Sequence, residues 1–192
     1  MPPKAKFTQD EIIQAALNIV RKEGIRALTA RALGDRLGSS ARPIFTVFES
    51  MEDVQQAVIL AAKKLYKEYI GRGLSEEIAF KGVGKQYILF AIKEPKLFQL
   101  LFMSEQDTVP NVSSVLPLID ESYEEILLSI KKGYGISGES AQKLYQHLWI
   151  YSHGIAALCA TNMCSFTGQQ IGDMMTEIFK GILKNLEGKS DD

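Results

Sequence analysis

The 192-residue chain has few of the residues that most often perform catalysis or bind metals. It contains two cysteines, Cys159 and Cys164, and two histidines, His147 and His153. A disulfide framework or a zinc site needs more ligands at closer spacing, so we expect two buried thiols in an apolar helix. The two histidines lie about 240° apart around a helix, which excludes a metal ion shared between them. We expect no metal site.

Catalytic motifs are missing as well. The sequence shows no paired carboxylates, no Ser-His-Asp arrangement and no phosphate-binding loop, because Gly82-Val83-Gly84-Lys85 lacks the required length and the following Ser or Thr. We therefore expect neither an enzyme nor a bound cofactor.

Long uncharged apolar runs are also missing. Tyr87–Ile92 is among the longest, well below the roughly 18 residues that a membrane span needs. The opening residues Met-Pro-Pro-Lys show no apolar segment of the kind that signal peptides carry. We expect a cytoplasmic protein without a membrane partner.

The net charge is only −1, but its distribution is uneven. Residues 1–50 carry eight basic and five acidic side chains, whereas the rest carries 14 basic and 18 acidic ones. The basic residues of the first part are Lys4, Lys6, Arg21, Lys22, Arg26, Arg31, Arg36 and Arg42. A positive N-terminal part on a negative body fits a protein that presents one end to a polyanion.

What the chain does have is apolar residues at helical spacing over most of its length, with no strand alternation. Capping signals such as Thr8 with Glu11, and glycines or prolines at the ends, predict about nine helices. We expect them to begin at Thr8, Thr29, Pro43, Ser50, Ser75, Leu97, Leu116, about Glu139 and Phe166. The helix that begins at Pro43 is expected to end before Ser50, and the other ends are expected at Gly24, the turn at Gly38, Gly71 and Gly73, Pro95, Met103, Lys132, Met163 and about Leu186. The sequence thus predicts an all-α fold.

Residues 28–54 carry the clearest motif. Two short helices are joined by a tight turn at Gly38-Ser39-Ser40, which is the helix-turn-helix arrangement whose second helix fits the major groove of DNA. Pro43 has no N–H to receive a cap from Ser40 and disfavours a helical conformation at Arg42. We therefore expect the second helix to begin at Pro43, with Arg42 at its exposed entrance.

This region resembles the N-terminal domain of the tetracycline-repressor (TetR) family of transcription regulators. The matching residues are Ile12-Ile13-Gln14-Ala15-Ala16, Gly24, Leu28-Thr29, Leu33, Gly38, Ser40, Ile44-Phe45, Phe48, Ser50 and Glu52, and Trp149 with His153-Gly154 echoes a segment of the family's eighth helix. The resemblance implies a DNA-binding domain over residues 1–50 and a helical ligand-binding and dimerisation domain over 51–192. It implies a repressor that binds a palindromic operator as a homodimer and responds to a small apolar or amphipathic effector.

Three positions depart from the family pattern. Phe45 stands where most members have a tyrosine, Met51 where most have a lysine, and Val47 where a histidine is frequent. The first two changes remove a hydroxyl and a charge that would contact phosphates, which predicts weaker binding and a flatter salt dependence unless Lys4, Lys6 or Arg42 compensates.

The candidate DNA contacts lie in and around the motif. Arg42 and Thr46 are one helical turn apart, and arginine and threonine are residue types that read base edges; the alternative is two ordinary solvated side chains. Thr29 and Ser50 are expected to cap helices and to present N–H groups to a phosphate. Phe45 is either core or a contact to a sugar. The full set is Thr29, Arg31, Ser39, Ser40, Arg42, Pro43, Phe45, Thr46 and Ser50.

The candidate effector site is made of aromatic and polar residues in the body of the chain. Taken one at a time, each of them is better explained as core packing. The set is Phe98, Phe102, Met103, Tyr123, Trp149 and His153. The last two helices carry more apolar face than one chain needs, which predicts a four-helix dimer interface; an intrachain core is the alternative. The competing functions are a helical small-molecule binding protein with a weakened DNA-binding head and a helical enzyme.

Overall fold

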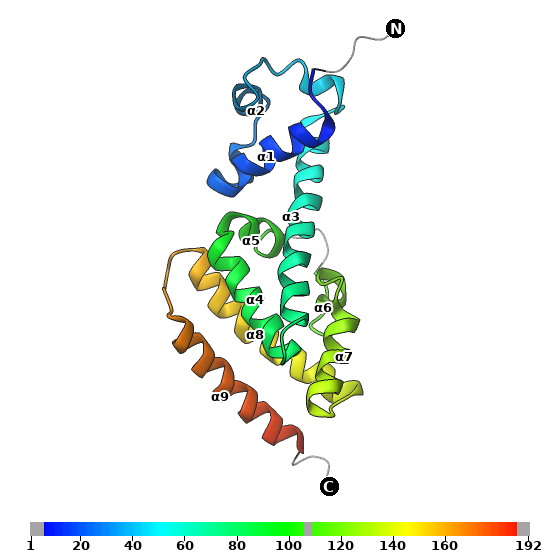
Figure 1. Cartoon of the computed structure of the whole chain (residues 1–192), viewed down its shortest axis with the longest axis vertical. Coiled ribbons are helices and arrows are strands. Elements are labelled where there is room, and N and C mark those ends of the chain that lie inside the picture. The colour runs from blue at the N-terminus through cyan, green and yellow to red at the C-terminus, as the bar shows by residue number, and fades with distance from the viewer. Residues whose placement is uncertain (1–5, 106–108, 188–192) are drawn as a thin grey trace. The chain divides into compact units, whose positions relative to one another are not determined.

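The computed structural model of the chain describes residues 6–105 and 109–187. The described part is all-helical, with no strand, which confirms the predicted fold class (Figure 1). Within these residues, two short 3-10 helices, η1 (Ile25–Ala27) and η2 (Ile44–Thr46), lie among nine α-helices. The α-helices are α1 (Gln9–Glu23), α2 (Ala30–Arg36), α3 (Met51–Leu74), α4 (Ala79–Lys93), α5 (Pro95–Phe102), α6 (Val115–Ile119), α7 (Tyr123–Tyr134), α8 (Gly138–Ala160) and α9 (Gly168–Glu187).

The helices form two compact units. Unit 1 comprises Met1–Tyr66 and Glu94–Ser104, and unit 2 comprises Lys67–Lys93 and Glu105–Asp192. Unit 1 therefore holds α5 together with the N-terminal helices, and α3 contributes residues to both units. The functional division expected after residue 50 stays a prediction.

In unit 1, α1 begins at the predicted capping box. The Glu11 backbone N–H donates to Thr8 Oγ1 over 3.2 Å, and the Thr8 backbone N–H donates to Glu11 Oε2 over 2.7 Å. Gly24, with φ of 90°, ends the helix in a conformation that glycine adopts readily. Helix α1 packs against η1, α2 and α5. The buried apolar side chains of this unit include Ile12, Val20, Leu28, Leu33, Ile44, Phe48 and Val54.

In unit 2, α4 packs against α7 and α8, and α8 packs against α9. Helix α3 runs through Gly71 and Gly73 to Leu74, so the prediction that these glycines end it was wrong. The physical reason is a close crossing with α4, because a Cβ on Gly73 would lie 2.7 Å from the backbone of Gly82. Glycine at both positions lets the two backbones touch.

Other predicted boundaries are shifted as well, among them the start of α5, which lies at Pro95 rather than Leu97. Helix α4 begins at Ala79 rather than after Ser75, since the Ser75 hydroxyl donates to the Gly71 carbonyl and extends the end of α3. The predicted helix over Leu116–Lys132 is split into α6 and α7, because the Asp120 carboxylate accepts the Ser122 backbone N–H and starts a new helix. Helix α8 ends at Ala160, three residues early, and Asn162 follows with φ of 56°.

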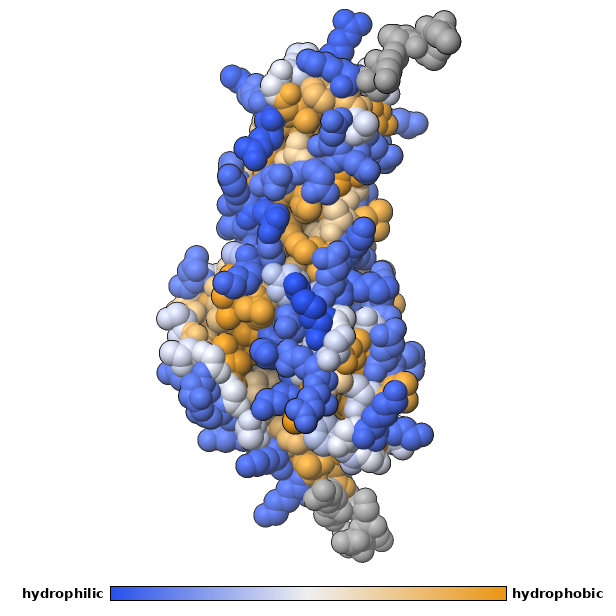
Figure 2. Space-filling model, viewed as in Figure 1, coloured by the Kyte–Doolittle hydropathy of each residue, from blue (hydrophilic) through white to orange (hydrophobic). Residues whose placement is uncertain are grey.

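Helix α9 begins at a second capping box, in which the Gln170 backbone N–H donates to Thr167 Oγ1 over 3.2 Å and the Thr167 N–H donates to Gln170 Oε1 over 2.8 Å. From residue 168 to 186, every α9 side chain is half-buried or exposed. Figure 2 shows hydrophobic side chains reaching the surface at the C-terminal end of this helix. The half-buried apolar residues of α9 are Ile171, Met174, Met175, Ile178, Phe179, Ile182, Leu183 and Leu186.

Candidate nucleic-acid interface

The predicted helix-turn-helix lies in unit 1 as α2, a tight turn and η2. Thr29 caps α2 as expected, accepting the Ala32 backbone N–H over 3.1 Å. The turn follows at Gly38, with φ of 64°, and the Ser39 backbone N–H donates to the Gly34 carbonyl over 2.9 Å. Sequence reasoning missed Gly34. A Cβ there would lie 3.0 Å from the backbone of residues 39–41, so glycine lets the turn lie directly on α2.

The second helix of the motif is shorter than predicted. Pro43 is the N-cap of a single 3-10 turn, Ile44–Thr46, instead of the first residue of an α-helix. The Ile44 N–H bonds the Ala41 carbonyl and the Val47 N–H bonds the Ile44 carbonyl, which is the three-residue pattern of a 3-10 helix. Ile44 is fully buried and fixes this turn to the core of unit 1.

The side chains expected to read DNA lie on the outside of this short turn. Arg42 and Thr46 are exposed, and Phe45 is 45% exposed. The Thr46 hydroxyl donates to the Pro43 carbonyl over 2.7 Å, so its oxygen remains available as an acceptor. Ile44 therefore anchors the turn in the core, while Arg42, Phe45 and Thr46 are exposed to solvent.

Three further candidates lie at α2 and the turn. The Arg31 side chain is 93% exposed, and its Nε stands 4.0 Å from Asp35 Oδ2, so its guanidinium is free to turn toward another anion. Ser40 is exposed, and the half-buried Ser39 accepts the Lys6 ammonium over 3.0 Å. Sequence reasoning listed Lys6 only as a compensating charge, and the structure brings it to the turn. Lys4 lies outside the described residues.

Ser50 caps α3, as expected, but it does so as part of a closed pair. The Asp53 backbone N–H donates to Ser50 Oγ over 3.1 Å, and both the Ser50 hydroxyl and the Ser50 N–H donate to Asp53 Oδ2 over 2.9 Å. A phosphate contact at Ser50 stays a prediction, and it requires this pair to open. Sequence reasoning missed Asp53, although the Ser-x-x-Asp spacing carries the signal.

The candidate effector residues fall into two groups. Phe98 and Phe102, on α5, and Met103, which follows them, belong to unit 1. Phe98 is fully buried with its ring 5.2 Å from that of Phe102, and Met103 is 43% exposed. Tyr123, Trp149 and His153 belong to unit 2.

The unit 2 group continues into a buried polar cluster around Tyr87. The Tyr87 hydroxyl lies 2.9 Å from His153 Nδ1 and accepts a hydrogen bond from the Trp149 indole. Burial raises the pKa of the Tyr87 hydroxyl and lowers that of the His153 imidazole, so both groups favour their neutral forms at this contact. The centres of the Trp149 and His153 rings are 5.3 Å apart.

A buried carboxylate lies at the other end of this cluster. Asp120 accepts the Tyr145 hydroxyl over 2.9 Å, and Tyr145 stacks on Tyr123 with ring centres 5.8 Å apart. Burial, and then the negative charge of Asp120, raise the pKa of Tyr145 well above its usual value. Tyr87, Tyr145 and Asp120 were not predicted, because nothing local in the sequence shows that residues so far apart meet.

The cysteines differ from the expected buried pair. Cys159 is half-buried in α8, whereas Cys164 is exposed beyond the end of that helix, because the helix stops before it. Among the residues that the structure describes, no group of three or more His, Cys, Asp or Glu side chains is placed to hold a metal ion.

None of the helices in the described ranges combines the length and the apolar content that crossing a membrane requires.

Comparison with known proteins gives one informative result. No protein-family model matches the chain. The chain is, however, similar to a protein of Mycobacterium tuberculosis named as an uncharacterized HTH-type transcriptional regulator, with 23% identity over 168 residues that make up 83% of this chain and 73% of that protein.

Proposed function

We propose that this chain is a DNA-binding transcription regulator that reads its operator with the α2–η2 segment of unit 1. The observation that carries the proposal is the exposure of Arg42, Phe45 and Thr46 on a turn held in place by the buried Ile44. Arginine pairs with the O6 and N7 atoms of guanine, and threonine contacts base edges or the thymine methyl group. The similarity to a helix-turn-helix regulator supports the same assignment.

The proposal extends to the architecture that the TetR resemblance implies. DNA binding is assigned to residues 1–50, and effector binding and dimerisation to residues 51–192. The regulator is proposed to repress transcription from a palindromic operator as a homodimer, because a two-fold symmetric protein matches a two-fold symmetric site.

The α8–α9 region supports the dimer. Helix α9 contacts α8 within the chain, yet its apolar side chains remain half-buried, and Ile150 and Leu158 of α8 are 48% and 36% exposed. A second copy would cover these side chains. Light scattering should give a dimer for the wild-type protein and a monomer for Ile178→Glu, while Lys180→Glu, an exposed position on the same helix, should remain dimeric. A monomeric wild type would contradict this part of the proposal.

The polar cluster of unit 2 supports a small amphipathic effector. Aromatic walls with a few polar groups are typical of small-molecule sites, and Tyr123, Trp149 and His153 are half-buried. The effector is proposed to bind one conformation more tightly than the other and so to change operator affinity.

The central experiment selects binding sites from a random pool of double-stranded DNA with the purified full chain. We expect a spaced palindrome that binds less tightly as salt rises, since phosphate contacts release counterions. Arg42→Ala should lose about 1–3 kcal/mol of binding free energy, whereas Arg26→Ala, an exposed arginine of η1, should bind nearly as the wild type does. Failure to bind any DNA at low salt would overturn the proposal.

One alternative has structural support. A helical small-molecule binding protein with a weakened head would explain why η2 has a single turn and why both donors of Ser50 are bonded to Asp53. The selection experiment separates the two functions. If a metabolite panel yields a tight ligand while the pool yields no site, the alternative is correct.

A further inference from the structure

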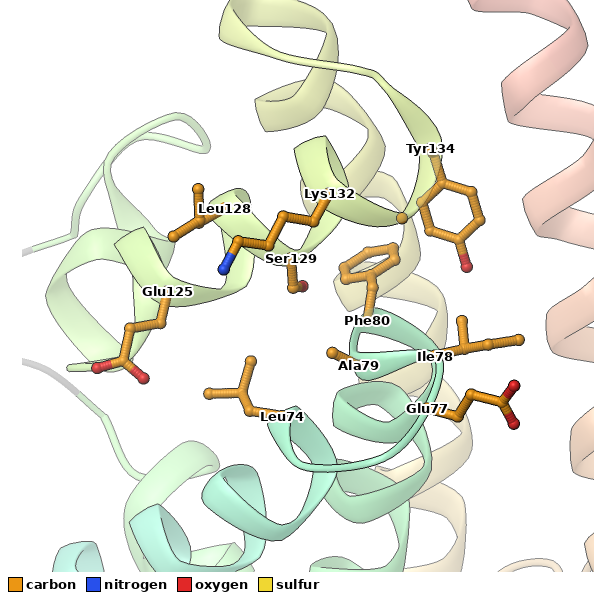
Figure 3. Close-up of a pocket in the computed structure, with 11 residues that line it drawn as sticks. Leu74, Glu77, Ile78, Ala79, Phe80, Glu125, Leu128, Ser129, Lys132 and Tyr134 are labelled. Atoms are coloured by element: carbon orange, nitrogen blue, oxygen red, sulfur yellow. The ribbon is translucent and has the colours of Figure 1, made fainter.

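A pocket of about 610 Å³ lies inside unit 2, away from all six predicted effector residues. It is formed where α3 ends, α4 begins and α7 passes (Figure 3). The close crossing of Gly73 and Gly82 fixes the α3 and α4 sides of it, and α4 also packs against α7. The volume falls in the range of about 300–1,000 Å³ that is usual for small-molecule sites.

The lining is mainly apolar. Phe80 is buried at the base, and Ile78 and Leu128 are each 48% exposed beside the hollow. Leu74 and Tyr134 complete the apolar part, and Figure 3 shows Phe80 and Tyr134 next to one another. Large apolar side chains left half-exposed around a hollow are stabilised when an apolar group covers them. The occupant therefore has an apolar body.

Three charged side chains line the pocket, Glu77, Glu125 and Lys132, and Figure 3 shows Glu77 on the opposite side from the other two. Figure 3 shows the nitrogen of Lys132 between Leu128 and Glu125, so a cation and a carboxylate flank the same end of the pocket. The two do not form an ion pair with each other, and within the described residues no ion pair is found for either. Lys67, for comparison, is bonded to Glu121 over 3.0 Å. The charge of Glu125 also acts on Lys67, whose pKa it helps to raise. Two opposite charges at one end, not joined to each other in an ion pair, complement a head group that carries both signs.

We propose that this pocket binds an amphipathic zwitterion, whose apolar chain lies on Leu74, Phe80 and Leu128 and whose anionic and ammonium groups face Lys132 and Glu125. This binding site is separate from the proposed regulator function and needs no DNA. The proposed occupant is a single dissolved molecule that enters the pocket from the solvent.

The test uses dodecylphosphocholine below its micelle concentration as the zwitterionic probe and octyl glucoside as an uncharged one, both measured by calorimetry on the full chain without DNA. We expect one saturable site per chain. Lys132→Gln and Glu125→Gln should each weaken binding of the zwitterionic probe by roughly two- to fivefold, the range for exposed charge pairs. Neither substitution should change the affinity for the uncharged probe. The matched controls Lys131→Gln and Glu124→Gln, exposed neighbours on α7 that do not line the pocket, should change neither.

A filling variant tests the location of the site. Gly133 lines the pocket, and a Cβ on it would meet nothing within 4 Å, so Gly133→Phe should fold and block both probes. Gly71→Phe is the control, because Gly71 also has open space and is not part of the lining. Equal binding by Gly133→Phe and Gly71→Phe would overturn the proposal. The proposal would also be wrong if Lys132→Gln weakened binding of the zwitterionic probe and Glu125→Gln did not, because the pocket would then recognise only an anionic group.

A last arm distinguishes the source of the head group. The wild type should not sediment with phosphatidylcholine vesicles. If the wild type sediments with the vesicles and Gly133→Phe does not, the proposal of a dissolved ligand is wrong and the pocket binds a bilayer lipid.

Discussion

The Arg21 guanidinium and the Glu94 carboxylate form a two-point ion pair between α1 and the residue that precedes α5. Arg21 Nε donates to Glu94 Oε2 over 2.7 Å, and Arg21 Nη2 donates to Glu94 Oε1. The Glu94 side chain is 7% exposed and that of Arg21 is 43% exposed. The pair joins α5 to the helices that carry the candidate DNA interface, all within unit 1.

Removing the arginine should therefore destabilise the protein. Arg21→Ala leaves a buried carboxylate without its main partner, and we expect a loss of about 1–3 kcal/mol in the free energy of unfolding, reduced by the partial exposure of Arg21. Urea unfolding measures the loss, and Lys22→Ala, an exposed neighbour, serves as the control. The double variant with Glu94→Ala should lose less than the sum of the two single variants. Equal effects of Arg21→Ala and Lys22→Ala would contradict this account.

The crossing of α3 and α4 predicts a sharp contrast between two glycines. A Cβ on Gly82 would overlap the Gly73 carbonyl oxygen, so Gly82→Ala should cost about 1–3 kcal/mol or prevent folding. A Cβ on Gly84, in the same helix, would make ordinary contact with Met175 Cε at 3.7 Å. Gly84→Ala should then be neutral or stabilise by up to about 1 kcal/mol through helix propensity. Thermal unfolding of both variants decides the matter, and the reverse order would refute the crossing.

His153 predicts how stability depends on pH. Burial lowers its pKa in the folded state, so the unfolded chain binds the proton more readily. The contribution to stability is complete above the unfolded pKa of about 6.5 and is lost as the pH falls below it. His153→Gln keeps a hydrogen-bonding side chain beside Tyr87 and should flatten the loss of stability between neutral pH and pH 5. His147→Gln, at the exposed histidine, should retain the wild-type profile. Identical profiles for the two variants would exclude His153 as the cause.

The unusual residues at the interface predict gains in DNA affinity. Phe45→Tyr places a hydroxyl at a position that is 45% exposed, which should tighten binding without steepening the salt dependence. Met51→Lys adds a charge at the first residue of α3 and should steepen the logarithmic salt slope by about 0.9. Leu60→Lys adds the same charge further along α3, where the side chain is 66% exposed, and should do neither. Titrations against the selected operator at several salt concentrations test all three.

The two thiols should react at different rates. Cys164 is exposed, while Cys159 is half-buried and its pKa is raised by burial and by the neighbouring Cys164. Since the thiolate is the reactive form, Cys164 should be alkylated several times faster than Cys159 at neutral pH. Peptide mass spectrometry over time identifies the order. Cys164→Ser should retain only the slow phase, and faster labelling of Cys159 would contradict the observed exposures.

The sequence was sufficient where a structural signal is local. The caps at Thr8 and Thr29 depend on residues three positions apart, and both form the expected hydrogen bonds. The helical periodicity gave the all-α class for the same reason. Two local signals were misread: Gly73 serves a helix crossing rather than a helix end, and Asp120 starts a new helix inside an apolar run.

The candidate sites show where sequence reasoning stops. Arg42 was predicted to be exposed at the start of the second helix of the motif, and it is, but the length of η2 depends on how the turn rests on Gly34. Tyr87 and His153 are 66 positions apart, and no local pattern announces their hydrogen bond. The pocket that Lys132 lines is formed by residues around α3, α4 and α7, so it too could not be predicted from a local sequence pattern.

A substitution at Gly34 could change which operator sequence the proposed regulator prefers, although Gly34 itself is buried. Because Gly34 has no side chain, the backbone of residues 39–41 lies close against α2, and a Cβ at position 34 would be only 3.0 Å from that backbone. Any larger residue would shift the turn, and with it Arg42, by a few tenths of an ångström. Operator preference can therefore drift through a buried position while every side chain that faces the DNA stays the same.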